Sequence, residues 1–105
     1  TRYNPEQLLL AALSQCHMLS FLHVAVKHGV VVTGYEDNAE GLMKLNRDGS
    51  GQFESVTLKP NVTITDPAHA VLMSQLHHEA NQVCFIARSV NFPVLHEPIT
   101  TAAAA

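Results

Sequence analysis

Residues 4–29, NPEQLLLAALSQCHMLSFLHVAVKHG, decide the fold, because a marked helix start is followed by a long apolar sequence. Asn4 is a helix-capping residue, Pro5 suits the first helical position, and Gln7 can complete a capping box with Asn4. Gly29 offers a left-handed end to the helix. Because apolar residues occupy nearly every face of this segment, we expect one long helix that is central and buried.

Residues 8–26 of this segment are apolar enough to be compared with a membrane span. Polar side chains interrupt the run at Ser14, Gln15, His17, Ser20 and His23. Such interruptions are unfavourable inside a lipid bilayer. We therefore interpret the segment as a helix of a protein core, and we expect no membrane association.

The composition of the 105-residue chain fits one small domain that shares its core with a partner. Hydrophobic residues make up 47% of the chain and charged residues only 14%, which leaves more apolar surface than a small monomer buries. We therefore expect a dimer. The net charge of −3 and the scattered positions of the six Lys and Arg residues argue against nucleic-acid binding.

Two cysteines are too few for the disulfide framework of a secreted domain, and no export signal precedes the first helix. We therefore expect a cytoplasmic protein. The chain starts at Thr1 instead of a methionine and ends in four alanines, so we expect an incomplete N-terminus. We assign residues 3–98 to one domain and residues 99–105 to a tail.

Residues 30–64 predict a long antiparallel hairpin after the helix. The β-branched run from Val30 starts an alternating strand that continues to Leu45, and residues 47–51 form a glycine-rich turn. In the return strand, Phe53 is out of phase with the other apolar residues. This irregularity predicts a bulge or a twist near the turn.

The remainder of the chain predicts a second helical region and a short final strand. Asp66 and Pro67 repeat the signal of a cap followed by proline, and an apolar stripe then continues to about Val90. Pro93 ends this region, and residues 94–95 form a short edge strand. The order of helix, hairpin, helix and strand predicts an α+β domain.

Cys16 and Cys84 are the only cysteines of the chain, and each lies in a distinctive segment. Two thiols held by structured segments suggest a redox couple that opens and closes a disulfide. Each cysteine alone also fits inert packing inside an apolar helix. His77 and Asn81 lie on the same helical face as Cys84, and such polar neighbours weaken that alternative. The decisive question is whether folding brings the two sulfur atoms within bonding range.

The spacing of the candidate ligands disfavours a metal site. Suitable residue types occur at Cys16, His17, His77, His78 and Cys84. Neither cysteine belongs to a Cys-x-x-Cys pair, however, and no second histidine completes a helical His-Glu-x-x-His zinc motif. We therefore expect no metal, and we expect the seven histidines to lie mostly at the surface or at helix ends. The absence of a serine-centred elbow or a glycine-rich phosphate loop argues against hydrolases and nucleotide-binding proteins.

Three segments of the chain resemble the OsmC/Ohr family, named after osmotically inducible protein C and the organic hydroperoxide resistance protein. They are residues 4–9 (NPEQLL), 11–17 (AALSQCH) and 77–94 (HHEANQVCFIARSVNFPV). The resemblance covers about residues 4–98 and includes the order of the elements. It implies an α+β OsmC-like fold built as an intertwined homodimer, in which the central helices pack together.

The resemblance also implies a thiol peroxidase of the oxidative stress response that reduces organic hydroperoxides to alcohols without a bound cofactor. Cys16 then corresponds to the cysteine that attacks the peroxide, Cys84 to the resolving cysteine, and Glu6 to the carboxylate that orients an activating arginine. An external dithiol, such as the lipoyl group of a partner protein, reduces the resulting disulfide. Because Glu6 and Cys16 are separated by about 15 Å on one straight helix, we expect Glu6 to serve the cysteine of the partner chain.

The chain departs from the family at its start, where the family has further strands and the activating arginine. Arg2 does not match that arginine, so we expect these strands and this side chain to be missing from the sequence. The alternative to a peroxidase is a non-catalytic dimeric module that binds a hydrophobic small molecule between its apolar helices. In that case both cysteines are structural, and an organic hydroperoxide leaves them unchanged.

Overall fold

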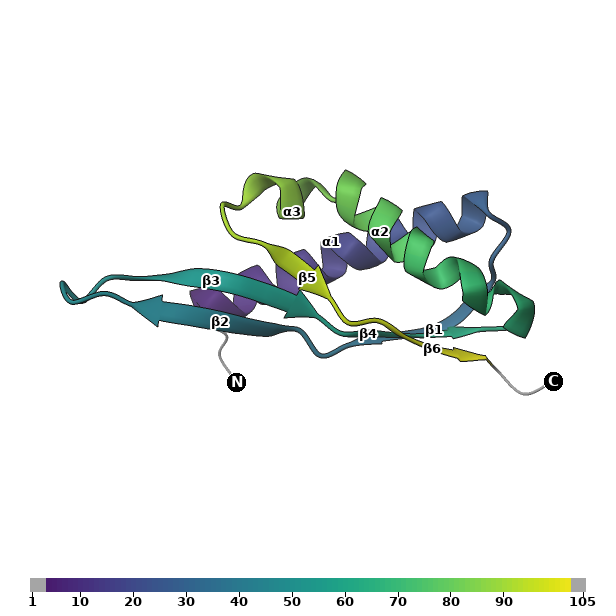
Figure 1. Cartoon of the computed structure of the whole chain (residues 1–105), viewed down its shortest axis with the longest axis horizontal. Helices are drawn as coiled ribbons and strands as arrows, with labels where there is room; N and C mark the ends of the chain where they lie inside the picture. Colours follow the sequence, from purple (N-terminus) through teal and green to yellow (C-terminus); the bar gives the residue numbers. More distant parts are fainter. Residues whose placement is uncertain (1–3, 103–105) are drawn as a thin grey trace.

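The computed structural model describes residues 4–102, and its helices lie along one side of the strands (Figure 1). The helical elements are α1 (Pro5–Lys27), the 3-10 helix η1 (Pro67–Leu72), α2 (Met73–Val83) and α3 (Phe85–Ser89). The strands are β1 (Val32–Asp37), β2 (Glu40–Leu45), β3 (Gly51–Leu58), β4 (Pro60–Ile64), β5 (Val94–His96) and β6 (Ile99–Ala102). They form two three-stranded sheets, in the orders β1-β4-β6 and β2-β3-β5. The predicted α+β class is confirmed.

Helix α1 begins and ends where the sequence predicts. The Asn4 side chain accepts a hydrogen bond from the backbone N–H of Gln7 at 2.8 Å, and the Gln7 side chain accepts one from the N–H of Asn4 at 3.2 Å. These two bonds form the capping box. Gly29 follows the helix in the left-handed region, with a φ of +71°.

By length and composition, α1 is the one helix in residues 4–102 that can cross a membrane, with a mean hydropathy of 1.6. It packs against α2 and α3, and Leu13 and Phe21 on its inner face are fully buried. It is therefore the central helix of the fold. Leu19 and Val26 are exposed, so in the single chain α1 is buried along one face only.

The predicted hairpin is divided between the two sheets. Strand β1 pairs antiparallel with β4, and β2 pairs antiparallel with β3. At the division, Pro60 has no N–H to continue a ladder, and the Asp37 carboxylate accepts the backbone N–H of Lys59 at 2.7 Å. The predicted long antiparallel hairpin is therefore present, but these groups interrupt it and assign its two halves to different sheets.

The predicted irregularity near Phe53 is confirmed as a β-bulge. Leu42 pairs with Ser55 and Met43 pairs with Phe53, so Glu54 is the extra residue of β3. The ring of Phe53 packs against Phe92, with ring centroids 5.4 Å apart. The bulge thus turns an out-of-phase aromatic side chain towards the core.

The C-terminal segment adds a parallel strand to each sheet. Strand β5 pairs with the edge of β3, which confirms the predicted edge strand, and β6 pairs with β4. Residues 99–102, which the sequence analysis assigns to a tail, thus complete a sheet. Their sequence, ITTA, lacks the alternation of apolar and polar residues that marks a strand. Residues 103–105 lie outside the described part of the chain.

Two hydrophobic clusters fill the space between the helices and the sheets. Phe21 belongs to a cluster with Ile64 and Leu76, whereas Leu13 belongs to a second cluster with Val56. Leu13 and Phe21 are two turns apart on α1. The intervening turns of α1 therefore lie between the two clusters, and they carry the first cysteine.

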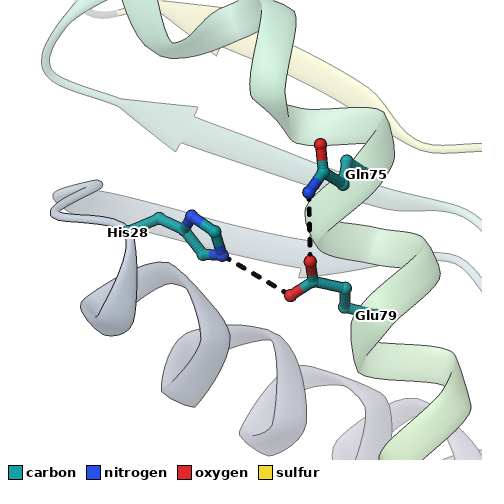
Figure 2. Close-up of polar contacts among 3 residues, drawn as sticks. All are labelled: His28, Gln75 and Glu79. Atoms are coloured by element: carbon teal, nitrogen blue, oxygen red, sulfur yellow. Dashed lines mark hydrogen bonds and ion pairs between the residues drawn. The ribbon is translucent and has the colours of Figure 1, made fainter.

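A polar contact joins the end of α1 to α2. Glu79 of α2 accepts a hydrogen bond from Gln75 at 3.1 Å, and its other carboxylate oxygen lies 3.5 Å from Nε2 of His28, the C-cap of α1 (Figure 2). The Gln75 hydrogen bond and, to a smaller extent, His28 lower the pKa of Glu79. The carboxylate is therefore ionised at neutral pH and helps to hold α2 against the end of α1.

Candidate active site

Cys16 of α1 and Cys84, which lies between α2 and α3, are brought together by the fold. Both are free thiols, and the side chain of Cys84 lies close enough to that of Cys16 to influence its pKa. Cys16 is half-buried, whereas Cys84 is only 1% exposed. The fold thus brings the two cysteines near each other, and the more accessible thiol belongs to Cys16.

The backbone at Cys84 differs from the predicted single helix. Cys84 has an extended ψ of 114°, which ends α2 and makes this residue the N-cap of α3. The carbonyl of Gln82 loses its helical partner and instead accepts a hydrogen bond from the Arg88 guanidinium at 3.3 Å. The predicted second helical region reaching about Val90 is present, but the chain breaks at Cys84, so this cysteine lies between two helices and not within one.

Burial keeps Cys84 in the thiol form. Burial first, and then the hydrogen bond with Cys16, raise the pKa of the Cys84 thiol to about 11. The backbone N–H groups of Ala87 and Ile86 in α3 act in the opposite direction, because they stabilise a thiolate. At neutral pH, Cys84 therefore retains its proton.

Glu6 lies in the first turn of α1, exposed to solvent, on the same helix as Cys16. The rise of an α-helix separates the two residues by about 15 Å along the axis. The single chain therefore does not bring Glu6 to its own Cys16. The expected role of Glu6 at the cysteine of a partner chain stays a prediction.

Three histidines form a stack that begins next to Cys16. Nε2 of His17 and Nδ1 of His77 are hydrogen-bonded at 3.0 Å, and their rings are almost parallel, with an angle of 8° between the planes. His96 of β5 packs against His17, with ring centroids 4.9 Å apart. His17 and His77 are 1% and 2% exposed. The expectation that histidines lie mostly at the surface or at helix ends is wrong for these residues.

The stack is uncharged at neutral pH. Burial, followed by the neighbouring His96 and His77, lowers the pKa of His17 to about 3. Burial and His96 lower the pKa of His77 to about 4. In a neutral pair, one imidazole donates the shared hydrogen bond and the other accepts it. Within residues 4–102, Nδ1 of His17 and Nε2 of His77 have no hydrogen-bond partner.

Helical spacing is the sequence signal that reveals these histidines. His17 follows Leu13 by one turn and precedes Phe21 by one turn, so it shares their buried face. His77 follows the buried Met73 of α2 by one turn in the same way. A histidine in phase with an apolar stripe therefore indicates a buried imidazole. The polar character of histidine, considered without this spacing, predicts a surface position instead.

The described residues offer no metal centre. Across residues 4–102, no group of three or more His, Cys, Asp or Glu side chains has an arrangement that could hold a metal ion. The three histidines instead contact one another through the His17–His77 hydrogen bond and through their rings. The arrangement of thiols at Cys16 and Cys84 can support sulfur chemistry without a metal, because a thiolate is itself a nucleophile.

An open groove of about 430 Å³ lies along α1 beside β1. It is lined by Leu10, Ala11, Ser14, Gln15, Met18, Tyr35, Asp37 and Ala39. At its polar end, the Ser14 hydroxyl donates to the Asp37 carboxylate at 2.5 Å. These lining residues of the described chain include neither cysteine, so the groove is separate from the thiol pair.

A comparison with protein families decides the identity of the fold. The family described as OsmC-like protein matches residues 1–97 of the chain. The chain belongs to the OsmC-like family. A comparison with the curated proteins gives no match.

Solved structures of OsmC-like proteins have the same fold. An OsmC-like protein of unknown function from Vibrio cholerae is 40% identical, with a TM-score of 0.81 over 90% of this chain. The chain spans 63% of the length of that protein. An OsmC-like protein from Mycoplasma pneumoniae is 13% identical, with a TM-score of 0.82, and covers 96% of this chain and 74% of its own.

The organic hydroperoxide resistance protein OhrB of Bacillus subtilis is 24% identical to the chain, with a TM-score of 0.71. The match covers 96% of this chain and 72% of the Bacillus protein. At this level of identity the likeness shows the OsmC-like fold alone.

Proposed function

We propose that this OsmC-like protein is a thiol-dependent peroxidase that reduces organic hydroperoxides to alcohols. The observation that carries the proposal is the proximity of Cys16 and Cys84, because it places an accessible thiol beside a buried one. Membership of a family that includes organic hydroperoxide resistance proteins supports a role in resistance to peroxides.

In the first step, the thiolate of Cys16 attacks the terminal oxygen of the hydroperoxide. An S–O bond forms, the O–O bond breaks, and the released alkoxide takes up a proton to leave as an alcohol. Cys16 thereby becomes a sulfenic acid. The accessible position of Cys16 favours this role, since the substrate has to reach the sulfur.

In the second step, the sulfur of Cys84 attacks the sulfur of the Cys16 sulfenic acid. The S–S bond forms, the S–O bond breaks, and the oxygen leaves as water. The proximity of the two side chains in the reduced protein supports a step between residues of one chain. A dithiol reductant, such as a protein-bound lipoyl group, then returns both cysteines to thiols, and the protein needs no bound cofactor.

We further propose that the active protein is a cytoplasmic homodimer in which Glu6 of one chain serves Cys16 of the other. The exposed apolar side chains Leu19 and Val26 of α1 support a second chain on this face, because isolated apolar surface of this kind favours association. In a dimer, Glu6 can approach Cys16 of the second chain, whereas Cys16 of its own chain lies too far along the same helix.

Thiol titration with an organic hydroperoxide tests the proposed reaction. In the full-length protein, one equivalent of cumene hydroperoxide is expected to remove both free thiols of each chain and to release one equivalent of alcohol. The Cys16→Ser variant is expected to retain its remaining thiol. Unchanged thiols in the wild-type protein would refute the peroxidase.

The groove beside α1 favours a second candidate, a module that binds a hydrophobic small molecule without catalysis. Leu10, Met18 and Ala39 give the groove apolar walls, as expected of a binding site for small molecules. The same titration separates the two functions. The binding module is the better account if hydroperoxide leaves the thiols intact and a fluorescent apolar probe binds the wild-type protein but not the Leu10→Asp variant.

A further inference from the structure

The hydrogen-bonded imidazoles of His17 and His77 lie on the same two chain segments as the cysteines. His17 directly follows Cys16 on α1, and His77 lies two turns before Cys84 on α2. The helices thus meet at two linked points, one between imidazoles and one between thiols. Neither histidine touches the proposed substrate or has a role in the sulfur chemistry described above.

Apart from the partly exposed pair of His28 and Glu79 at the end of α1, the remaining contacts between α1 and α2 are not directional. Around the imidazole pair they come from apolar side chains such as Phe21, Leu76 and Ala80. Apolar packing is not directional, so neighbouring registers of such a contact differ little in energy. A buried polar pair selects one register, because every other register leaves its polar groups without partners.

The narrow range of Cα–Cα distances that a disulfide allows shows why the register of α2 along α1 matters. Cα atoms joined by a disulfide are about 4.4–6.8 Å apart, and one residue of an α-helix rises about 1.5 Å. A slip of α2 by two residues along α1, about 3 Å, therefore exceeds the width of this range. A hydrogen bond between two buried ring nitrogens at 3.0 Å allows a smaller displacement than that.

We propose that His17 and His77 are positioning residues, and that their hydrogen bond sets the register of α1 against α2 that brings Cys84 to Cys16. This inference rests on the proposed function, since it assigns the pair to the formation of the Cys16–Cys84 disulfide. The ring of His77 is held in turn by Phe21, with ring centroids 4.2 Å apart and a 20° angle between the planes. The pair is thus fixed from both helices.

The test measures the equilibrium of the Cys16–Cys84 disulfide in glutathione buffers at pH 7, on the full-length protein. The informative variant is the double replacement His17→Leu/His77→Leu, which removes both partners and leaves no buried nitrogen unpaired, so that stability is largely retained. We expect the effective concentration of the two thiols to fall at least tenfold, which corresponds to about 30 mV in reduction potential. The matched control is His78→Leu, which changes the exposed neighbour on α2 and should leave the potential unchanged.

A second pair of variants keeps the test decisive if the double variant does not fold. Asparagine carries a polar nitrogen close to the place of Nδ1, the atom that His77 uses, so His77→Asn should retain most of the effective concentration. His77→Gln places its amide one bond farther from the backbone, so this variant should lose most of the effective concentration of the two thiols. Wild-type potentials in the double variant, or in both single variants, would overturn the positioning role.

Kinetics separate this proposal from the peroxidase itself. In the double variant, formation of the Cys16 sulfenic acid should stay within twofold of the wild-type rate, while the disulfide step slows at least tenfold. Disulfide formation in glutathione requires no peroxide. A shifted potential in a protein that does not react with hydroperoxide would therefore retain the positioning role and reject the peroxidase.

Discussion

The buried Cys84, at the break that separates α2 from α3, lies close to the half-buried Cys16 of α1. In the proposed reaction, this difference in burial favours different tasks for the two sulfur atoms. Cys16 is open to a substrate, whereas Cys84 is open only to Cys16. Removing one or the other cysteine should therefore stop the reaction at different stages.

The Cys84→Ser variant should stop the reaction after its first step. Without a resolving thiol, one equivalent of organic hydroperoxide converts Cys16 to a sulfenic acid, and an excess converts it further to the sulfinic acid. Mass spectrometry after trapping with dimedone measures the first product directly. Consumption of peroxide by this variant without a trapped product at Cys16 would contradict the assigned order of attack.

The rate of the disulfide step should rise with pH. Because burial raises the pKa of the Cys84 thiol to about 11, the nucleophilic thiolate is a minor species at pH 7 and becomes more abundant at every higher pH. We expect an increase of about tenfold per pH unit between pH 6 and pH 8. Stopped-flow measurement of the second phase after peroxide addition gives this rate, and a flat profile over that range would contradict a protonated Cys84.

The protein should lose stability as the pH falls below 6.5. His17 and His77 have folded-state pKa values of about 3 and about 4, below the ordinary value of 6.5, so the unfolded chain binds protons more tightly. Their contribution is complete above pH 6.5 and decreases as the pH falls from there towards the folded-state values. At pH 5 each histidine should lower the free energy of unfolding by about 2 kcal/mol.

Urea denaturation at several pH values between 4 and 8 measures this dependence. Carboxylates contribute to acid destabilisation as well, so the informative comparison is with the His17→Leu/His77→Leu variant. That variant should show a flatter decline below pH 6.5 than the wild type. Equal slopes would show that the two imidazoles do not carry the effect.

Replacing Asp37 by alanine should destabilise the bend between the two sheets. Its carboxylate accepts hydrogen bonds from the Lys59 backbone and from the Ser14 hydroxyl, so the replacement leaves a partly buried N–H without its partner. We expect a loss of about 1–3 kcal/mol in the free energy of unfolding. The neighbouring exposed residue provides the control, since Glu36→Ala should change stability by less than about 0.5 kcal/mol.

The sequence predicts those features that depend on local signals. The limits of α1 follow from the capping box at Asn4 and from Gly29, and both are present. The bulge opposite Met43 follows from the phase of Phe53. These features could be predicted because each depends on a few adjacent residues.

The features that the sequence does not predict depend on contacts between distant residues. The hairpin divides where Asp37 meets Lys59, and the second helix breaks at Cys84, where the Arg88 guanidinium replaces a helical partner of Gln82. Strand β6 forms because β4 offers a free edge. Of the candidate site, the two cysteines were found from the sequence, whereas the partnership of His17 with His77 required the fold.

The central claim is that peroxide joins Cys16 to Cys84 within one chain. Its most direct test treats the full-length protein with one equivalent of an organic hydroperoxide, blocks the remaining thiols, and identifies the disulfide-linked peptides by mass spectrometry. The account predicts one dominant linkage, between the peptides that contain Cys16 and Cys84, in chains that run as monomers on a denaturing non-reducing gel. Free thiols after peroxide treatment, or linkages only between different chains, would contradict it.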